Sequence, residues 1–228
     1  YLPLPGLLAR VCDHPCEQGC LRGDLGGAVN LHGLEIFCTE HLGVQTRSLP
    51  MPRKQKRIAV IGAGLAGLVC AWDLAGKGYP VTVFHEGDLK AQLLSCWPVL
   101  AGAGAAALDA EWEALGRRGV RFEQASTDAA CLQQAAGEYE GVLLDAGALP
   151  ELAPAEDGVD AQILHWRDNI CCAGWASVTP TGHRFASASR QAGQGRSAAR
   201  TLERLVAGVS LTAARDTDER SLYTELDG

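Results

Sequence analysis

Apolar residues along the chain gather in short runs that alternate with amphipathic stretches. Ile58–Ile61 and Val81–Phe84 are apolar, β-branched runs of the length expected for buried strands of a parallel sheet. Between them, Leu65–Ala75 is rich in alanine and leucine and is followed by two glycines, a pattern that predicts a helix and its end. Strand, helix and strand in this order predict a βαβ unit.

The same alternation continues toward the C-terminus, and no segment repeats another. We expect further helices over 109–115, 129–136 and 187–206, and further strands over 119–123, 141–147 and 170–173. The expected fold class is therefore α/β with a parallel sheet, preceded by a small cysteine-rich helical segment.

Composition divides the chain into four parts. Residues 1–45 hold four of the nine cysteines, and residues 46–56 contain two prolines and several basic residues, which suits an exposed linker. Residues 57–212 contain the predicted sheet and its helices, and residues 213–228 form a polar C-terminal tail. We expect a domain boundary at the linker.

Three glycines stand between the first predicted strand and its helix. A phosphate group close to a backbone needs positions without a Cβ and free N–H donors, and a helix start supplies both donors and a favourable dipole. Gly62 permits the tight turn, Gly64 the close approach of the phosphate, and Gly67 the packing of helix on strand. This context indicates a Rossmann-like pocket for a dinucleotide diphosphate, and the alternative is a βαβ unit without a ligand.

The end of the second predicted strand is the usual place of a carboxylate that binds the adenosine ribose. His85 and Glu86 are the candidates at this place, and Glu86 follows the glycine loop at a plausible distance.

The N-terminal cysteines are closely spaced. Cys12, Cys16 and Cys20 form a C-x3-C-x3-C pattern that can wrap three thiolates around one centre, and Cys38 is a candidate fourth ligand. A cysteine upstream of Tyr1 is the alternative fourth ligand. Thiolates bind both iron–sulfur clusters and zinc, and a zinc site could also use one of three nearby histidines, His14, His32 and His41.

Composition and charge restrict the possible function. Hydrophobic residues make up 47% of the chain and charged residues 21%, as in soluble globular proteins. The net charge of −7 argues against a nucleic-acid-binding surface, because phosphate binding relies on clustered Lys and Arg. No apolar run approaches the roughly 20 residues of a membrane span. Nine cysteines, an odd number, without a signal-peptide pattern indicate a reducing cytoplasm.

Several segments together resemble the small subunit of glutamate synthase and its relatives, which are iron–sulfur flavoproteins. RVCDHPCEQGC with LRGDLGGAVNLHGLEIF is similar to that family's cluster segment, and KRIAVIGAGLAGLVCAWDLAGKGYPVTVF to its FAD-binding entry. EYEGVLLDAGALP stands where the family has a strand ending in Ala-Thr-Gly, and the block from NICCAGWAS onward is similar to its closing FAD motif.

The resemblance implies two cofactors, FAD and a 4Fe-4S cluster. The implied cluster ligands are Cys12, Cys16, Cys20 and Cys38. The implied FAD-binding residues are Gly62, Ala63, Gly64, Ala66, Gly67, His85, Glu86, Gly147, Gly174, Trp175 and Gln191.

The sequence also departs from this family. Only a short connector lies between Gly147 and Ile170, where the family inserts a second Rossmann domain for NADPH. His85 stands in place of the usual ribose-binding glutamate, and Gly174-Trp175 in place of a Gly-Asp pair that holds the ribityl chain. We therefore expect a shortened form of the family without its own NADPH site.

These features favour an electron-transfer subunit of a multi-subunit oxidoreductase. Such a subunit would relay electrons between FAD, the 4Fe-4S cluster and a partner subunit that carries the catalytic centre or further iron–sulfur clusters. One alternative is a structural or assembly subunit with a degenerate flavin domain and a zinc or static cluster site. Another is an autonomous flavin oxidoreductase with an unrecognised nicotinamide site.

Overall fold

The computed structural model describes residues 2–42, 51–103, 105–155, 158–160, 162–175, 177–178, 184–185 and 187–213. A six-stranded sheet with the order β3-β2-β1-β4-β6-β5 forms its centre. Five of these strands are parallel, and β5 runs antiparallel to β6. The strands are β1 Ile58–Ile61, β2 Val81–His85, β3 Val120–Gln124, β4 Gly141–Asp145, β5 His165–Arg167 and β6 Ile170–Ala173.

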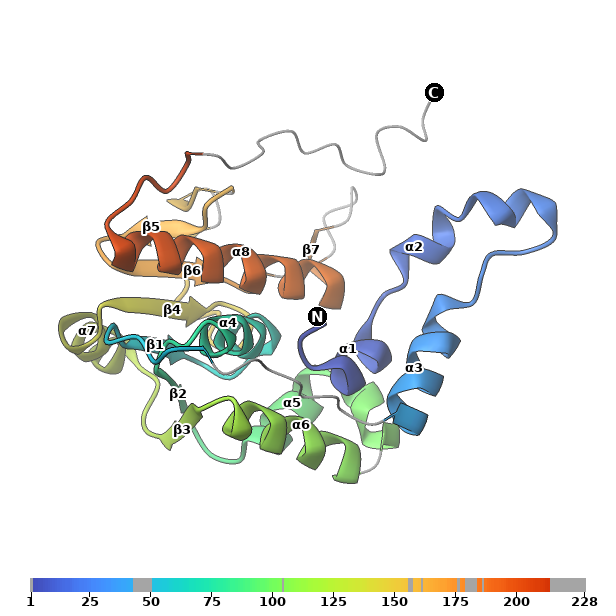
Figure 1. Ribbon diagram of the computed structural model, residues 1–228, viewed down its shortest axis with the longest axis horizontal. Coiled ribbons are helices and arrows are strands. Elements are labelled where there is room, and N and C mark those ends of the chain that lie inside the picture. The colour runs from blue at the N-terminus through green and yellow to red at the C-terminus, as the bar shows by residue number, and fades with distance from the viewer. Residues whose placement is uncertain are drawn as a thin grey trace.

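Helices cover the sheet. Within the sheet domain they are α4 Leu65–Gly76, α5 Leu89–Cys96, the 3-10 helix η2 Pro98–Ala103, α6 Ala105–Arg117, α7 Ala129–Glu138 and α8 Ala188–Ala207. Figure 1 shows α8 and α4 next to each other, and these two helices make the most extensive helix–helix contact in the described chain. A separate two-stranded antiparallel pair is formed by β7 Ser177–Val178 and β8 Arg184–Phe185. The sequence prediction of an α/β fold with a mostly parallel sheet is confirmed.

The centre of the sheet is buried on both faces. Every residue of β1 and β4 is buried, as expected for parallel strands covered by helices on both sides. The chain leaves β1 toward β2 and β3 and later returns to β4 on the other side of β1. The crevice at the carboxyl ends of β1 and β4 is therefore the point where the strand order reverses, the usual ligand position in such sheets.

The N-terminal segment consists of short helices. These are α1 Pro5–Val11, α2 Pro15–Gln18, the 3-10 helix η1 Leu21–Leu25 and α3 Leu31–Leu42. α1 contacts α6 and η2 and buries Leu7 and Leu8 in the same hydrophobic cluster as the sheet. Beyond α1, the segment extends away from the sheet (Figure 1) and leaves apolar side chains exposed, Phe37 among them.

Several features were not expected from the sequence. α5 and η2 lie in a stretch with a weak helical pattern, and the three-residue strand β5 adds an antiparallel edge next to β6. Of the predicted linker at 46–56 the structure describes residues 51–56, and of the predicted tail at 213–228 it describes residue 213 alone. Among the helices that the structure describes, none has both the length and the apolar character needed to cross a bilayer.

Candidate functional site

The predicted glycine loop lies at the carboxyl end of β1, as its sequence position requires. Gly62 has φ +93°, in the left-handed region that favours glycine, and its N–H donates to the carbonyl of Phe84 on β2 at 3.0 Å. Gly64 is the N-cap residue of α4 and provides no side-chain cap. The first turn of α4 therefore presents backbone N–H groups that need an acceptor from elsewhere.

One such acceptor comes from the neighbouring strand. β1 and β4 pair with Ile61 opposite Leu144, so Asp145, the last residue of β4, lies beside the start of the glycine loop. The Asp145 side chain is fully buried, and its Oδ2 accepts a hydrogen bond from Gly67 N–H at 2.6 Å. Its Oδ1 accepts from Gly147 N–H at 2.9 Å and, more weakly, from Ala148 N–H at 3.3 Å.

Four of the predicted cofactor-binding glycines surround this carboxylate. A Cβ at Gly64 or Gly67 would lie 2.7 or 2.8 Å from Asp145 Oδ2. A Cβ at Gly147 or Gly174 would lie 3.1 or 2.4 Å from Asp145 Oδ1. Each distance is shorter than an ordinary van der Waals contact. The small size of these four residues is therefore required by a side chain of this chain, independently of any ligand.

The buried position also changes the acidity of Asp145. Burial disfavours the charged form, and the backbone N–H groups of Gly67, Gly147, Ala148 and Gly64 favour it. Burial is the larger effect and raises the pKa of Asp145 to about 6. Sequence reasoning did not identify this residue, although an acidic residue that ends an apolar strand directly before Ala-Gly was visible.

A cavity of about 520 Å³ opens above the glycine loop. It gathers residues from the ends of β1, β4 and β6, from α5 and from the start of α8. The predicted cofactor-binding residues that line it are Ala63, Gly64, Gly147, Gly174, Trp175 and Gln191. Lining residues that were not predicted include Leu65, Gln92, Leu93, Cys96, Trp97 and Pro150. No Lys, Arg, Asp or Glu is among the described lining residues of this cavity.

One lining side chain has an unused donor. The indole Nε1 of Trp175 is buried and has no hydrogen-bond partner among the described residues. A buried N–H without an acceptor costs free energy, so this position favours a bound group that supplies an acceptor. Next to it, the Gly174 N–H donates to Gln194 Oε1 of α8 at 2.7 Å, which ties the cavity wall to this helix.

The remaining predicted residues are not among those that line the cavity. Gly62, Ala66 and Gly67 form the loop and helix start beneath it. His85, at the end of β2, is nearly buried, and its Nδ1 lies 3.1 Å from the carbonyl oxygen of Gly87. Glu86 Oε1 accepts from the backbone N–H of Thr127 at 3.4 Å.

The N-terminal cysteines are free thiols in the described chain. Cys12 and Cys20 are partly exposed, and Cys16 and Cys38 are exposed. Hydrogen bonds from the backbone N–H groups of Val29 and Arg22 lower the pKa of the Cys20 thiol, whereas burial raises that of Cys12. Within the described residues, no three His, Cys, Asp or Glu side chains are grouped as a metal site. The predicted set of four ligands is thus not assembled in this arrangement.

Asp13 connects the cysteine segment to the cavity wall. Ser187, the N-cap residue of α8, donates its hydroxyl to Asp13 Oδ2 at 2.9 Å, and the Ser189 N–H donates to Oδ1 at 3.2 Å. Burial opposes ionisation of Asp13, but the hydrogen bonds from Ser189 and Ser187 outweigh it and lower the pKa. Cys12, the neighbour of Asp13, is thereby held near the helix that carries Gln191 and Gln194.

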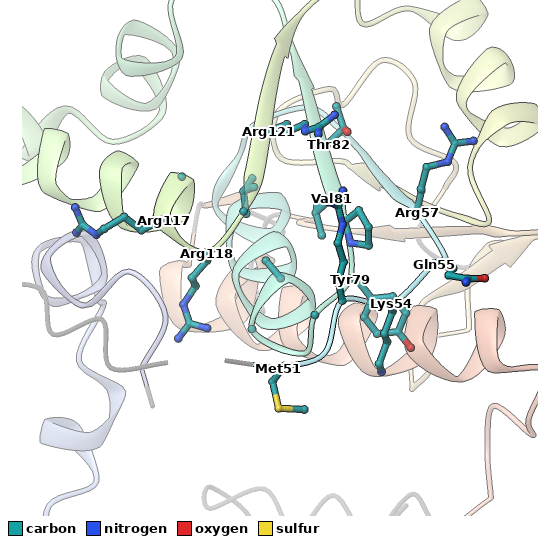
Figure 2. Close-up of a pocket in the computed structure, with 18 of the residues that line it drawn as sticks. Met51, Lys54, Gln55, Arg57, Tyr79, Val81, Thr82, Arg117, Arg118 and Arg121 are labelled. Carbon is teal, nitrogen blue, oxygen red and sulfur yellow. The ribbon is translucent and has the colours of Figure 1, made fainter. Parts of the chain in front are cut away.

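A second and larger cavity of about 970 Å³ lies at the opposite, amino end of the sheet. Its cationic lining residues are Arg53, Lys54, Arg57, Arg117, Arg118 and Arg121. Figure 2 shows that the labelled cationic side chains do not converge on one point, since Arg57 and Arg117 point in opposite directions.

Four of these cations have partners within the chain. Lys54 Nζ lies 3.4 Å from Glu203 and 4.0 Å from the ring centre of Tyr79. Arg118 stacks 4.0 Å over the ring of Trp72. Arg57 donates to the carbonyl of Glu138, and Arg117 pairs with Glu113 at 3.1 Å. Four of the six cations thus have a contact within the chain, and two of these contacts, those of Lys54 and Arg117, are with a carboxylate.

A family model of known proteins matches the part of the chain that holds the glycine loop. A family model described as glucose inhibited division protein A matches residues 57–137, which span β1 to α7. The NADPH-Fe(3+) oxidoreductase subunit beta of Geobacter sulfurreducens is 41% identical over 87 residues, 37% of this chain and 13% of that protein.

Two further relatives show similar coverage. The NADP(+)-dependent formate dehydrogenase subunit beta of Moorella thermoacetica is 36% identical over 107 residues, 36% of this chain and 15% of that protein. The glutamate synthase [NADPH] small chain of Bacillus subtilis is 35% identical over 95 residues, 40% of this chain and 19% of that protein. These matches confirm the resemblance to the glutamate synthase small chain and its relatives, although the chain spans less than a fifth of their length.

Proposed function

We propose that this chain is an electron-transfer subunit of a multi-subunit oxidoreductase and that it binds FAD in the cavity at the carboxyl ends of β1 and β4. The observation that carries the proposal is the convergence of separate segments on one cavity. The glycine loop, the end of β4, the end of β6 and the start of α8 all contribute lining residues. A family model matches residues 57–137, which hold the glycine loop, and three similar proteins are named as a subunit of an NADPH-Fe(3+) oxidoreductase, a subunit of a formate dehydrogenase and the small chain of a glutamate synthase.

The cavity suits the diphosphate and the flavin ring for different reasons. Leu65 and Ala66 are the first two residues of α4, and their N–H groups have no acceptor within the helix, so they are suited to the diphosphate. Trp175 Nε1 provides an unpaired donor, and Gln191 an amide, on the wall formed by β6 and α8. Leu93 on α5 and Trp97 at its end give the cavity apolar surface, which excludes water from a bound ring system. When bound, a flavin supplies one- and two-electron chemistry.

The end of β2 provides the candidates for the adenosine ribose. His85 replaces a carboxylate there, and an imidazole nitrogen accepts or donates one hydrogen bond where a carboxylate accepts two. Glu86 is already bonded to Thr127 N–H, at a long distance of 3.4 Å. We therefore assign a weaker ribose contact to this chain than the usual glutamate gives.

The assignment of a 4Fe-4S cluster to Cys12, Cys16, Cys20 and Cys38 rests on their spacing and on the resemblance. Their arrangement in the structure is not that of a ligand set. The contact of Asp13 with the start of α8 supports this assignment, because it holds the cysteine segment against the flavin-side helix. We also propose that a partner subunit donates electrons to this chain or accepts them from it.

The test is a visible spectrum of anaerobically purified protein together with flavin, iron and sulfide analysis. The proposal expects stoichiometric FAD, and iron with sulfide that is lost in Cys16→Ser while FAD is retained. Cys131→Ser is a matched control, because Cys131 is a partly exposed thiol on α7, away from the N-terminal segment. Flavin without iron would refute the cluster assignment alone. A colourless protein without flavin, iron or sulfide would refute the whole proposal and favour a structural or assembly subunit.

A further inference from the structure

The first turn of α4 already interacts with one negative charge of the protein itself. Gly67, the third residue of the helix, donates its N–H to Asp145 Oδ2, whereas Gly64 caps the helix without a side chain. Asp145 thus caps α4 from a different strand and places a carboxyl group where the helix dipole favours an anion. The N–H groups of Leu65 and Ala66, on the same turn, are the ones left for a diphosphate.

A diphosphate bound at this turn would lie close to the Asp145 carboxyl group. Two negative charges within a few ångströms disfavour each other's ionised form, most strongly where water is absent. Asp145 is fully buried, and the cavity above it has no Lys or Arg among its described lining residues to offset the repulsion. The hydrogen-bond donors to the Asp145 carboxyl group include the backbone N–H groups of Gly67 and Gly147.

We infer that Asp145 controls diphosphate binding at the glycine loop through its protonation state. The ionised carboxylate caps α4 and disfavours the ligand, and binding is accompanied by uptake of one proton by the carboxyl group. The carboxylate becomes a neutral acid, and the ligand keeps its two charges. This inference rests on the proposed flavin site and gives that site a pH-dependent affinity.

The groups that face Asp145 make it the titrating group in this range. The thiols of Cys70 on α4 and Cys172 on β6 interact with it electrostatically, but burial raises the pKa of both and keeps them neutral. The charges of Asp73 on α4 and of Lys77 directly after it have opposite effects on the pKa of Cys70: Asp73 raises it and Lys77 lowers it. β1 contributes apolar residues, and α8 contributes the amides of Gln191 and Gln194 near Gly147 and Gly174. The pKa of Asp145, raised by burial to about 6, lies within the physiological range.

The test is a titration of the purified chain with FAD between pH 5.5 and 8, followed by flavin fluorescence. We expect the affinity of the wild-type chain to fall as pH rises above about 6, by up to roughly tenfold per pH unit, since one proton is taken up. In Asp145→Asn the pH dependence disappears and the affinity at pH 7.5 is higher than in the wild type. Asp145→Ala should likewise show an FAD affinity that does not change with pH, and it replaces Asp145→Asn in the test if the asparagine variant does not fold.

One control variant separates Asp145 from another buried carboxyl group. Glu111→Gln removes a carboxyl group whose pKa burial raises to about 7, but Glu111 lies between α6 and α1 and does not line the cavity. This variant should keep the pH-dependent affinity of the wild type.

The outcomes distinguish this inference from the function on which it rests. If the wild-type chain binds FAD with the same affinity at every pH, or if Asp145→Asn keeps the wild-type slope, the inference is wrong and the flavin site stands. If neither the wild type nor the variants bind FAD at any pH, both are wrong. Calorimetric titration in two buffers of different ionisation enthalpy should show uptake of about one proton near pH 7.

Discussion

The two ends of the parallel sheet carry cavities of opposite character. The carboxyl end has a cavity of about 520 Å³ with no charged residue among its described lining residues, above a buried aspartate. The amino end has a cavity of about 970 Å³ lined by six Lys and Arg residues (Figure 2). Charge alone would direct an anionic dinucleotide to the amino end. The glycine loop, the helix start and the unpaired indole N–H are all at the other end.

We propose that geometry and unsatisfied backbone donors, rather than charged side chains, decide where an anionic dinucleotide binds. At the amino end, Arg117 and Lys54 pair with Glu113 and Glu203, and Arg118 and Lys54 lie over the rings of Trp72 and Tyr79, so part of the positive charge is already engaged within the protein. At the carboxyl end, the first N–H groups of α4 have no acceptor within the helix, and the cavity lies at this helix start. An anion gains more from fixed dipoles in a partly dry pocket than from exposed, paired side chains.

The largest effect is expected from Gly67→Ala. A Cβ there would lie 2.8 Å from the carbonyl oxygen of Gly62 and from Asp145 Oδ2, so the glycine loop must move. Overpacking of this kind costs about 1–3 kcal/mol, and we expect FAD affinity to fall by up to about 100-fold. Gly137→Ala on α7 is the matched control, because its Cβ would meet nothing within 4 Å. Equal FAD affinity in both variants would contradict the carboxyl-end site.

The second effect concerns stability against pH in the absence of ligand. The folded chain holds the Asp145 proton more tightly than the unfolded chain, with a pKa of about 6 against 3.8. Stability is therefore highest below pH 4 as far as this group is concerned, and it falls as pH rises to about 6, by roughly 3 kcal/mol. Urea unfolding at several pH values should show this loss in the wild type and a smaller one in Asp145→Asn. An unchanged pH profile in the variant would show that Asp145 is not the group responsible.

A smaller effect is expected from Trp175→Phe. The variant removes the unpaired Nε1 donor and keeps most of the aromatic surface, so FAD affinity should fall by about fivefold, the loss of one hydrogen bond. Trp112→Phe is the matched control, since Trp112 Nε1 on α6 is also buried without a partner among the described residues and does not line the cavity. Fluorescence titration of both variants measures the difference. Equal affinities would remove Trp175 from the binding site.

The smallest effect is expected from neutralising the amino end. Arg53 and Arg121 are exposed lining residues of that cavity. Arg53→Gln and Arg121→Gln should change FAD affinity by less than about twofold at an ionic strength of about 0.15 M, because exposed charges farther from the ligand than the Debye length of about 8 Å are screened. A loss comparable to that of Gly67→Ala would place the ligand at the amino end instead.

The sequence predicted the parts of the site that depend on local patterns. Gly62, Gly64 and Gly67 follow an apolar strand and precede a helix, and this local order alone determines the loop at the end of β1. Gly147 and Gly174 were found through the resemblance, and the structure brings them to the same cavity.

The parts that depend on contacts between distant segments were not predicted. Asp145 meets Gly67 only because β4 pairs with β1 in one register, and no pattern in the sequence gives that register. The contact of Asp13 with Ser187 joins residues far apart in the chain and was missed for the same reason. α1 was assigned to a separate segment, yet its apolar residues pack into the core of the sheet domain.

The central claim, that the ligand binds at the carboxyl end, is tested most directly by amide hydrogen exchange with and without FAD. We expect slower exchange at residues 63–66 and 147–148 on addition of FAD, because these N–H groups lie at the cavity. Exchange at residues 79–82 and 117–121, at the amino end, should stay the same. Protection confined to the amino end, with none at the glycine loop, would contradict the account.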